Sequence, residues 1–246
     1  MNLKRFLPFL PVLFLACGQE EITVPAAEAV QESDTLFVNV PEGTFINSVG
    51  DTVTVEAFSM MRSEVSNRLY RHLADNLNLA HPPDPGFPGM EDYFYNYPDY
   101  PVVNVSPFRA RKAASSMGCS LPTTDQWEYA ASLGLTGEIA GNFPWGILSP
   151  PDVPGVPANY MALDSWNDRD ADGYLYTAPS GEYPLSEGGF QDLAGNVSEM
   201  ALCYADSTIR LLGGSWAQPE DAMRFGYSRI IADGDIAWHA GFRFVK

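Results

Sequence analysis

Cysteine and histidine are scarce in this chain, and several motifs that carry enzyme chemistry are absent. Of three cysteines, only Cys119 and Cys203 lie outside the N-terminal segment, so they could form at most one disulfide. The histidines, His72, His81 and His239, have no His-Glu-x-x-His or comparable metal-binding spacing. The sequence contains neither a Gly-x-Ser-x-Gly nucleophile elbow nor a P-loop. These absences argue against zinc-protease, serine-hydrolase and phosphate-loop chemistry.

Basic residues are also few. Lysine and arginine number 14 against 31 aspartates and glutamates, and the net charge is −17, or −19 without Lys4 and Arg5. A nucleic-acid-binding surface needs clustered lysine and arginine, so we expect no nucleic-acid partner. Excess carboxylate fits solubility outside the cell and the binding of divalent cations.

No hydrophobic run is long enough to span a bilayer. The apolar segment Phe6–Ala16 follows Lys4 and Arg5 and ends at a small residue, as in a signal peptide. Phe14-Leu-Ala-Cys17 resembles a bacterial lipobox, which implies that Cys17 carries lipid and anchors the protein in the cell envelope. The alternative is a plain secretory signal with an incidental cysteine. Both interpretations place the mature chain outside the cytoplasm.

The rest of the chain is expected to be a tether and one domain. Residues 18–34 are rich in Gln, Glu, Ala and Ser, which is typical of a flexible tether. Residues 35–246 are enough for one large domain, and the aromatic content of 13% supplies a sizeable core. Because the sequence has 21 glycines and 20 prolines, we expect few long elements.

Local patterns predict a mixture of short strands and helices. We expect helices from near Ser66 to Leu77 and from Thr123 to Ala131, because capping residues precede each apolar pattern. A further helix is expected over Pro107–Met117, because Gly118 follows it and would end it. Strands are expected at Thr35–Val40, Thr52–Phe58, Arg210–Leu212 and Gly241–Val245. Residues 80–101 are expected to be loop, with much irregular structure beyond Gly134.

Eight segments, taken together, resemble the formylglycine-generating-enzyme or sulfatase-modifying-factor family. They are Glu64–Asn67, Tyr100–Ser106, Leu121–Ala131, Pro144–Gly146, Ala158–Asn159, Asp192–Glu199, Gly213–Trp216 and Gly241–Arg243. Each is weak alone, but their order and spacing match the family across residues 35–246. The resemblance implies an α+β fold related to C-type lectins, with much irregular structure and bound calcium.

The resemblance places two calcium sites on this chain. The first falls on Asn159, the Tyr160 carbonyl, Asp172 and the Tyr174 carbonyl, with a gap one residue shorter than in the family. The second falls on Asp192, the Gly195 and Val197 carbonyls and Glu199, with no gap. The segment Asp164–Tyr174 is itself dense in carboxylates and amides, as calcium requires, although Pro179 stands where an EF-hand loop has glutamate. The alternative is that these carboxylates only cap turns and face water.

The chemistry of the active family members is missing. Those enzymes oxidise a substrate cysteine to formylglycine with two cysteines, five residues apart, that hold copper(I) shortly after the Gly-Gly-Ser segment. Aligned on Gly213–Trp216, these positions carry Gln218 and Met223. Since copper(I) selects soft thiolates, we do not expect copper here.

Three functions remain open. The first is a calcium-stabilised binding or scaffold module that meets a protein or small ligand at the cell surface. The second is a ligand-binding protein diversified by a retroelement between Ala217 and Ala240. The third is an enzyme, either a formylglycine-generating oxidase that uses different ligands or an unrelated activity in the same cleft. Candidate cleft residues are Ser215, Arg224, Tyr227, Arg229 and Trp238, although both arginines could simply pair with carboxylates. The aromatic loop from His81 to Tyr100 could be a contact surface or could cover the core.

Overall fold

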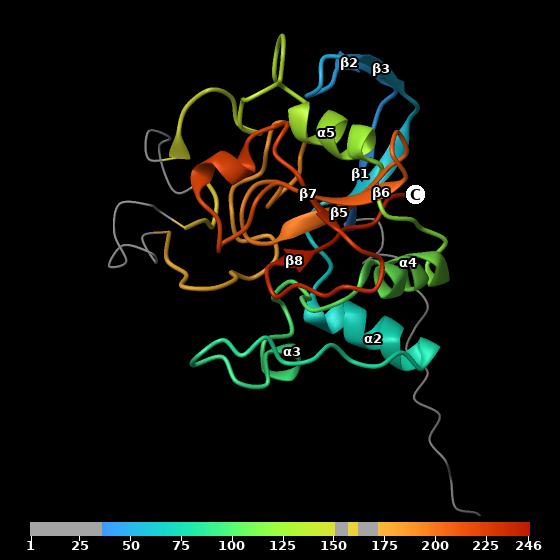
Figure 1. The fold of residues 1–246 in the computed structure, drawn as a ribbon, viewed down its shortest axis with the longest axis vertical. Helices are drawn as coiled ribbons and strands as arrows, with labels where there is room; N and C mark the ends of the chain where they lie inside the picture. Colours follow the sequence, from blue (N-terminus) through green and yellow to red (C-terminus); the bar gives the residue numbers. More distant parts are fainter. Residues whose placement is uncertain (1–35, 151–156, 162–171) are drawn as a thin grey trace, which may run out of the picture. The chain divides into compact units, whose positions relative to one another are not determined.

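Short elements joined by long turns build the fold (Figure 1). The computed structural model describes residues 36–150, 157–161 and 172–246. The strands are β1 (Phe37–Val40), β2 (Gly43–Ile46), β3 (Thr52–Val55), β4 (Phe58–Met61), β5 (Ser198–Cys203), β6 (Thr208–Leu212), β7 (Arg229–Ile231) and β8 (Ala240–Gly241). The helices are α2 (Asn67–Leu77), α3 (Tyr93–Asn96), α4 (Pro107–Ser116), α5 (Thr124–Ser132) and the 3-10 helix η2 (Glu220–Met223). The predicted α+β class is confirmed.

The strands form three small sheets. β1 pairs with β4 and β2 pairs with β3, both antiparallel. The third sheet has the order β7-β6-β5-β8, in which β5 and β8 are parallel and the other pairs antiparallel. In this sheet β5 is central, and five of its six residues are buried. It therefore positions side chains from the Asp192–Glu199 segment inside the domain.

Local capping explains where the helices begin. The Ser66 hydroxyl accepts a hydrogen bond from the Leu69 N–H at the start of α2. Thr123 and Gln126 form a reciprocal capping box at the start of α5. Pro107 occupies the first turn of α4, where its missing N–H costs nothing. These three predicted helices are confirmed.

The last residues close the core. The backbone of residues 242–246 bonds to β4 and its neighbours, including the Met61 N–H to the Phe244 carbonyl at 2.9 Å. Phe242 and Phe244 are fully buried in the cluster that also holds the inner faces of α2 and α4. A second cluster lies beneath α5 and contains Trp127 and Phe190.

Four expectations for the elements need correction. Of the strand expected at Gly241–Val245, only Gly241 lies in a strand, β8. The run Thr52–Phe58 is not one strand, because β3 pairs with β2 and the chain then crosses to pair β4 with β1. The expected loop 80–101 contains the short helix α3. The region beyond Gly134 contains β5 and β7, which sequence analysis missed. β5 is buried almost throughout, so it lacks the alternating pattern that marks a half-exposed strand. Among the described residues, no helix has the length and apolarity needed to cross a membrane.

Candidate functional site

Gln218, the first position expected to replace a copper-binding cysteine, lies in a buried network of hydroxyl groups. Its Oε1 accepts hydrogen bonds from Ser198 Oγ at 2.9 Å and Ser215 Oγ at 3.0 Å. Its Nε2 donates to the Tyr227 hydroxyl at 3.3 Å. Both ends of the amide are therefore engaged, and the network joins β5 to Tyr227 through the turn that follows Gly213–Trp216.

Met223, the second such position, is part of the core. It is 1% exposed and packs in an apolar cluster with Phe143 and Ala194. η2, which carries Met223, approaches the turn at Gly214 so closely that a Cβ there would lie 2.9 Å from the Ala222 backbone. The φ of +69° at Gly214 also favours glycine. The thioether is thus fixed among apolar side chains.

The two remaining described cysteines do not substitute for the missing pair. Cys119 and Cys203 are buried free thiols and form no disulfide. Cys119 belongs to the core cluster of α2 and α4. Burial raises the pKa of its thiol, and the charge of Lys246 opposes part of that rise. Cys203 ends β5 and lines a cavity of about 300 Å³. Neither belongs to the groups that surround Gln218 and Met223.

The five predicted cleft residues do not surround one cavity. Ser215 is fully buried, whereas Tyr227 is 38% exposed and Trp238 is 45% exposed. Arg224 pairs with a carboxylate of η2 at 2.9 Å and covers the Phe143 ring, and Arg229 is exposed on β7. The cavity of about 300 Å³ includes Tyr227 and none of the other four. Trp238 instead leans against the Trp216 ring at 5.1 Å.

A buried ion pair connects the Asp192–Glu199 segment to the end of the chain. Arg243 donates from Nη2 to Glu199 Oε1 at 2.6 Å and from Nε to Oε2 at 2.7 Å. The Trp127 indole donates to the same Oε2 at 3.0 Å. Arg243 also donates to the carbonyls of Met61, Arg62 and Gln191, so all its nitrogens are engaged. The pair thereby joins β4, β5 and α5.

Two further carboxylates lie close to this pair. Burial, and then the charge of Asp192, raise the pKa of Glu64 well above its usual range. Burial also raises the pKa of Asp192, although its hydrogen bond from the Gly181 N–H opposes the shift. Asn196 donates to Glu64 Oε1 at 3.0 Å. The cluster contains three acidic side chains and one arginine, so negative charge is in excess. Protonation of Glu64 removes one negative charge and reduces the repulsion among the buried carboxylates.

The first predicted calcium set is brought together in the structure. Asp172 accepts hydrogen bonds from the Tyr160 N–H at 2.8 Å and the Tyr174 N–H at 3.1 Å, which brings Tyr160 and Tyr174 to one carboxylate, and Asn159 precedes Tyr160 in the chain. Asn159 is 1% exposed, and its Oδ1 has no hydrogen-bond partner within the described residues. A buried amide oxygen without a partner is costly, and a calcium ion would satisfy it. Among the described residues, no group of three or more His, Cys, Asp and Glu side chains could hold a metal ion, so calcium at Asn159, Tyr160, Asp172 and Tyr174 stays a prediction.

The second predicted set fits a cation less well. The Glu199 carboxylate is neutralised by Arg243 and also accepts from Trp127. Asp192 accepts from the N–H groups of Gly181 and Tyr183. Gly195 packs so tightly on the Asn159 carbonyl that it has no room for a Cβ, so the two sets adjoin. Calcium at Asp192, Gly195, Val197 and Glu199 stays a prediction. The carboxylates of residues 164–170, which belong to the acidic segment Asp164–Tyr174, lie outside the described residues.

The aromatic loop between His81 and Tyr100 folds back over the core. Phe87, Tyr93 and Phe94 are each less than 5% exposed, and the Tyr93 hydroxyl donates to the Pro101 carbonyl at 2.7 Å. Most of its large rings therefore cover the core, which decides between the two alternatives for this loop.

Comparison with known families assigns the domain. A family model described as the sulfatase-modifying factor enzyme 1-like domain matches residues 20–246. The chain belongs to this family. The structure of PvdO from Pseudomonas aeruginosa is similar to the present one with a TM-score of 0.65 and 20% identity, covering 85% of this chain and 93% of that one. The similarity supports the sulfatase-modifying-factor fold.

Relatives in the family carry names of both active and inactive proteins. The chain is 33% identical over 137 residues to the inactive C-alpha-formylglycine-generating enzyme 2 of Bos taurus, covering 54% of this chain and 44% of that protein. It is 35% identical over 108 residues to the formylglycine-generating enzyme of Streptomyces coelicolor, covering 42% and 32%. The matched region thus spans less than half the length of either relative. Activity has to be judged from the site itself.

Several members of the buried charged cluster were not singled out by the sequence analysis. Glu64, Trp127 and Arg243 belong to segments that sequence analysis used only to identify the family. Their partnership spans up to 182 positions, as in the bond from Arg243 to the Met61 carbonyl. Glu64 begins one of the eight segments and Arg243 ends another, which was the only sequence signal for them.

Proposed function

We propose that this chain is a non-catalytic binding module of the sulfatase-modifying-factor family, exported and lipid-anchored in a bacterial cell envelope. The observation that carries the proposal is the state of Gln218 and Met223. The Gln218 amide is hydrogen-bonded at both ends, and Met223 is buried in apolar packing. Copper(I) selects thiolates, and these positions supply none. The family fold is thus retained while its metal-binding pair is replaced.

An activity assay tests the loss of chemistry. Residues 18–246, incubated with copper(I), a thiol reductant, oxygen and a Cys-x-Pro-x-Arg peptide, should form no aldehyde by mass spectrometry. An authentic formylglycine-generating enzyme provides the positive control. Aldehyde formation would overturn the proposal, and Cys119→Ser and Cys203→Ser would then identify the thiol responsible.

We propose that the binding surface includes Trp238 and Tyr227. Both rings are partly exposed, yet each is held by a buried partner, Trp238 by Trp216 and Tyr227 by Gln218. Aromatic side chains held in one orientation lose little entropy on binding and are frequent anchors of interfaces. A photo-crosslinking amino acid at position 238, in bacteria that express the chain, should capture a discrete partner. The same amino acid at Ile147, which is 77% exposed and lies outside the cavity that Tyr227 lines, is the control, and equal capture at both positions would contradict the assignment.

The proposed anchor rests on Lys4, Arg5 and the Phe14–Cys17 pattern. Cells that express the full chain should incorporate labelled palmitate into it, and Cys17→Ser should abolish the label while leaving export intact. Export without any lipid label would leave the plain secretory signal as the better interpretation.

We also propose that calcium stabilises the module at Asn159, Tyr160, Asp172 and Tyr174. Support comes from the unsatisfied Asn159 Oδ1 beside Asp172. Calcium would supply a fixed positive charge that holds these segments together.

A further inference from the structure

Helices α2 and α4 collect much of the positive charge of an acidic chain. They carry Arg68, Arg71, Arg109, Arg111 and Lys112, five of its 14 lysines and arginines. Asp75 is the one acidic residue in the two helices, and α4 has none. The helices pack against each other through the core cluster, so these charges lie on neighbouring elements. We call this surface the basic face.

Three of the cations are available for a partner. Arg68 pairs with Asp99 at 2.9 Å, and Arg111 pairs with Asp233 at 2.7 Å. Within the described residues, Arg71, Arg109 and Lys112 form no ion pair. The basic face therefore keeps a local positive charge on a chain of net charge −17.

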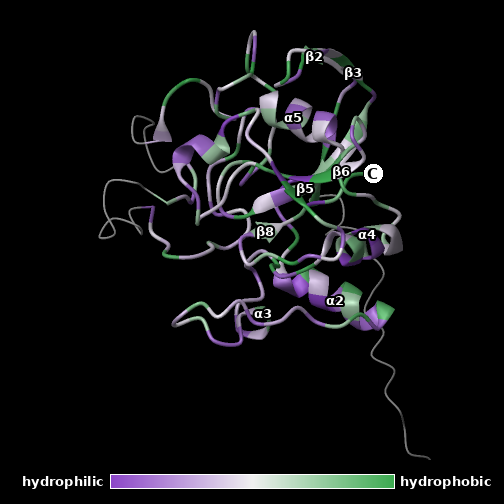
Figure 2. Ribbon diagram, viewed as in Figure 1, coloured by the Kyte–Doolittle hydropathy of each residue, from purple (hydrophilic) through white to green (hydrophobic). Residues whose placement is uncertain are grey.

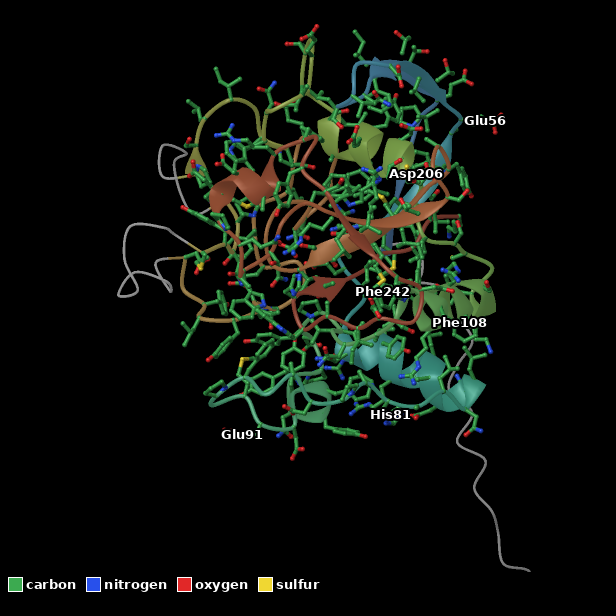
Figure 3. All side chains as sticks on the ribbon, viewed as in Figure 1. Glu56, His81, Glu91, Phe108, Asp206 and Phe242 are labelled. Carbon is green, nitrogen blue, oxygen red and sulfur yellow. The ribbon has the colours of Figure 1, made fainter. Side chains whose placement is uncertain are left out.

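Apolar side chains accompany these cations. A groove of about 420 Å³ is lined by Leu77, Leu79, Phe108, Arg111, Lys112 and Ser115. Phe108 belongs to α4 and is 48% exposed (Figure 3), with the Lys112 ammonium 4.9 Å from its ring centre. Leu77 and Met117 are also more than one-third exposed. Along α2, hydrophilic residues alternate with hydrophobic ones (Figure 2), and the helix ends at Leu77.

We propose that the basic face docks on an anionic lipid bilayer. Its free cations would contact headgroup phosphates, while Phe108 and the exposed leucine enter the interface between headgroups and acyl chains. The groove combines cationic and apolar side chains, as such a surface requires, and Arg71 and Arg109 lie on the same two helices. The five cations of α2 and α4 give this part of an acidic chain a charge complementary to anionic headgroups.

The position of the first described residues favours a bilayer over a soluble partner. This step rests on the proposed lipid anchor at Cys17. Leu36 and Phe37 pack against the same core cluster as the buried sides of α2 and α4. The intervening residues can span at most about 60 Å when fully extended. An anchored membrane is therefore within reach of α2 and α4, and weak docking would be reinforced by the anchor.

Vesicle sedimentation tests the proposal. The family match begins at residue 20 and the compact unit begins at Thr35, so residues 18–246 retain the fold. This protein should sediment with vesicles that contain phosphatidylglycerol and not with vesicles of phosphatidylcholine alone. Each cation near an anionic surface contributes about fivefold to binding, so Arg71→Gln, Arg109→Gln and Lys112→Gln together should weaken it about a hundredfold.

A matched variant controls for net charge. Val49→Glu, Ile147→Glu and Tyr204→Glu change the net charge equally at positions that are at least 76% exposed and outside the groove. At physiological salt, charges beyond about 8 Å are screened, so this variant should bind within about threefold of the parent. Phe108→Ala should weaken binding several-fold, whereas Ile230→Ala, an exposed residue on β7, should not.

Several results would overturn the proposal. They are equal binding to both kinds of vesicle, equal loss in the charge-matched variant, or competition by inorganic phosphate alone. Binding to a soluble polyanion such as heparin without binding to vesicles would assign the basic face to another partner. Palmitate labelling of the full chain separates the outcomes. If the label is absent while vesicle binding persists, the anchor is wrong and the docking surface stands.

Discussion

Arg243 and Glu199 are among the least exposed side chains of the protein, although both carry charge. Removing both charged groups from water costs free energy, and their mutual attraction offsets that cost only when their other polar atoms are also hydrogen-bonded. Arg243 donates its remaining hydrogens to backbone carbonyls, and Trp127 donates a further hydrogen bond to Glu199. The pair thus fixes where the ends of several segments meet. Removing one partner would leave the other charged, buried and unpaired.

We expect Arg243→Met to lower the free energy of unfolding by about 3–5 kcal/mol, measured by urea unfolding. Arg68→Met removes one partner of the exposed Arg68–Asp99 pair and should cost less than about 1 kcal/mol. Similar costs for the two variants would contradict this account of the Arg243–Glu199 pair.

Glu128 gives a prediction about pH. Burial is the main cause that raises its pKa from the ordinary 4.5, while hydrogen bonds from Ser48 lower it. The native state therefore holds this proton more tightly than the unfolded state, and that contribution to stability is lost as pH rises through the native pKa. The difference in unfolding free energy between the parent and Glu128→Gln should fall as pH rises from about 4 and then become constant.

Ser48→Ala is the matched control for that experiment. It removes a hydrogen bond that lowers the pKa of Glu128, so the pH at which the difference becomes constant should rise. A difference between parent and Glu128→Gln that does not change with pH would show that Glu128 keeps its ordinary pKa.

At the scale of elements, the helices α2, α4 and α5 were predicted, whereas strands β5 and β7 were missed, for one physical reason. The starts of α2 and α5 depend on Ser66 and Thr123, whose hydrogen bonds reach only three residues along the chain. β5 depends on partners on both sides and is buried on both faces, so its local sequence carries no alternation. Sequence rules that consider only neighbouring residues therefore predicted the helices whose capping is local and missed the strand whose partners are distant.

Thr123→Ala should lower the free energy of unfolding by about 1 kcal/mol, because it removes the side-chain half of the capping box of α5. Thr124→Ala, one residue inside the helix, is the control and should change stability by less than half as much. The measurement is urea unfolding of both variants beside the parent. If Thr123→Ala and Gln126→Ala were fully additive, the reciprocal box would not act as a unit.

At the scale of the whole molecule, the family segments predicted the fold but not the contacts within it. The order of the eight segments is visible in the sequence, whereas the meeting of Glu64, Asp192 and Arg243 depends on the folded chain. The same limit applies to the cleft, because exposure decides which of Ser215, Tyr227 and Trp238 can touch a ligand. Residue type alone does not supply exposure.

Calcium should stabilise the whole domain. With calcium at about a hundred times its Kd, stabilisation of about 2.7 kcal/mol should raise the melting temperature by about 5–10 °C, and a chelator should reverse it. Asn159→Ala and Asp172→Asn should each abolish the effect, whereas Asp51→Asn, at an exposed turn, should preserve it. Asp192→Asn reports on the second set. A melting temperature that ignores both calcium and chelator would rule out the stabilising role.

The buried segment 240–246 also governs when the protein can fold. β5 pairs with β8 there, Phe242 and Phe244 complete the core cluster, and Arg243 supplies the counter-charge for Glu199. A chain that has emerged only as far as residue 239 lacks all three. Such contacts between distant parts of a sequence form late and slow folding. During synthesis the polypeptide should therefore stay open until this segment has emerged.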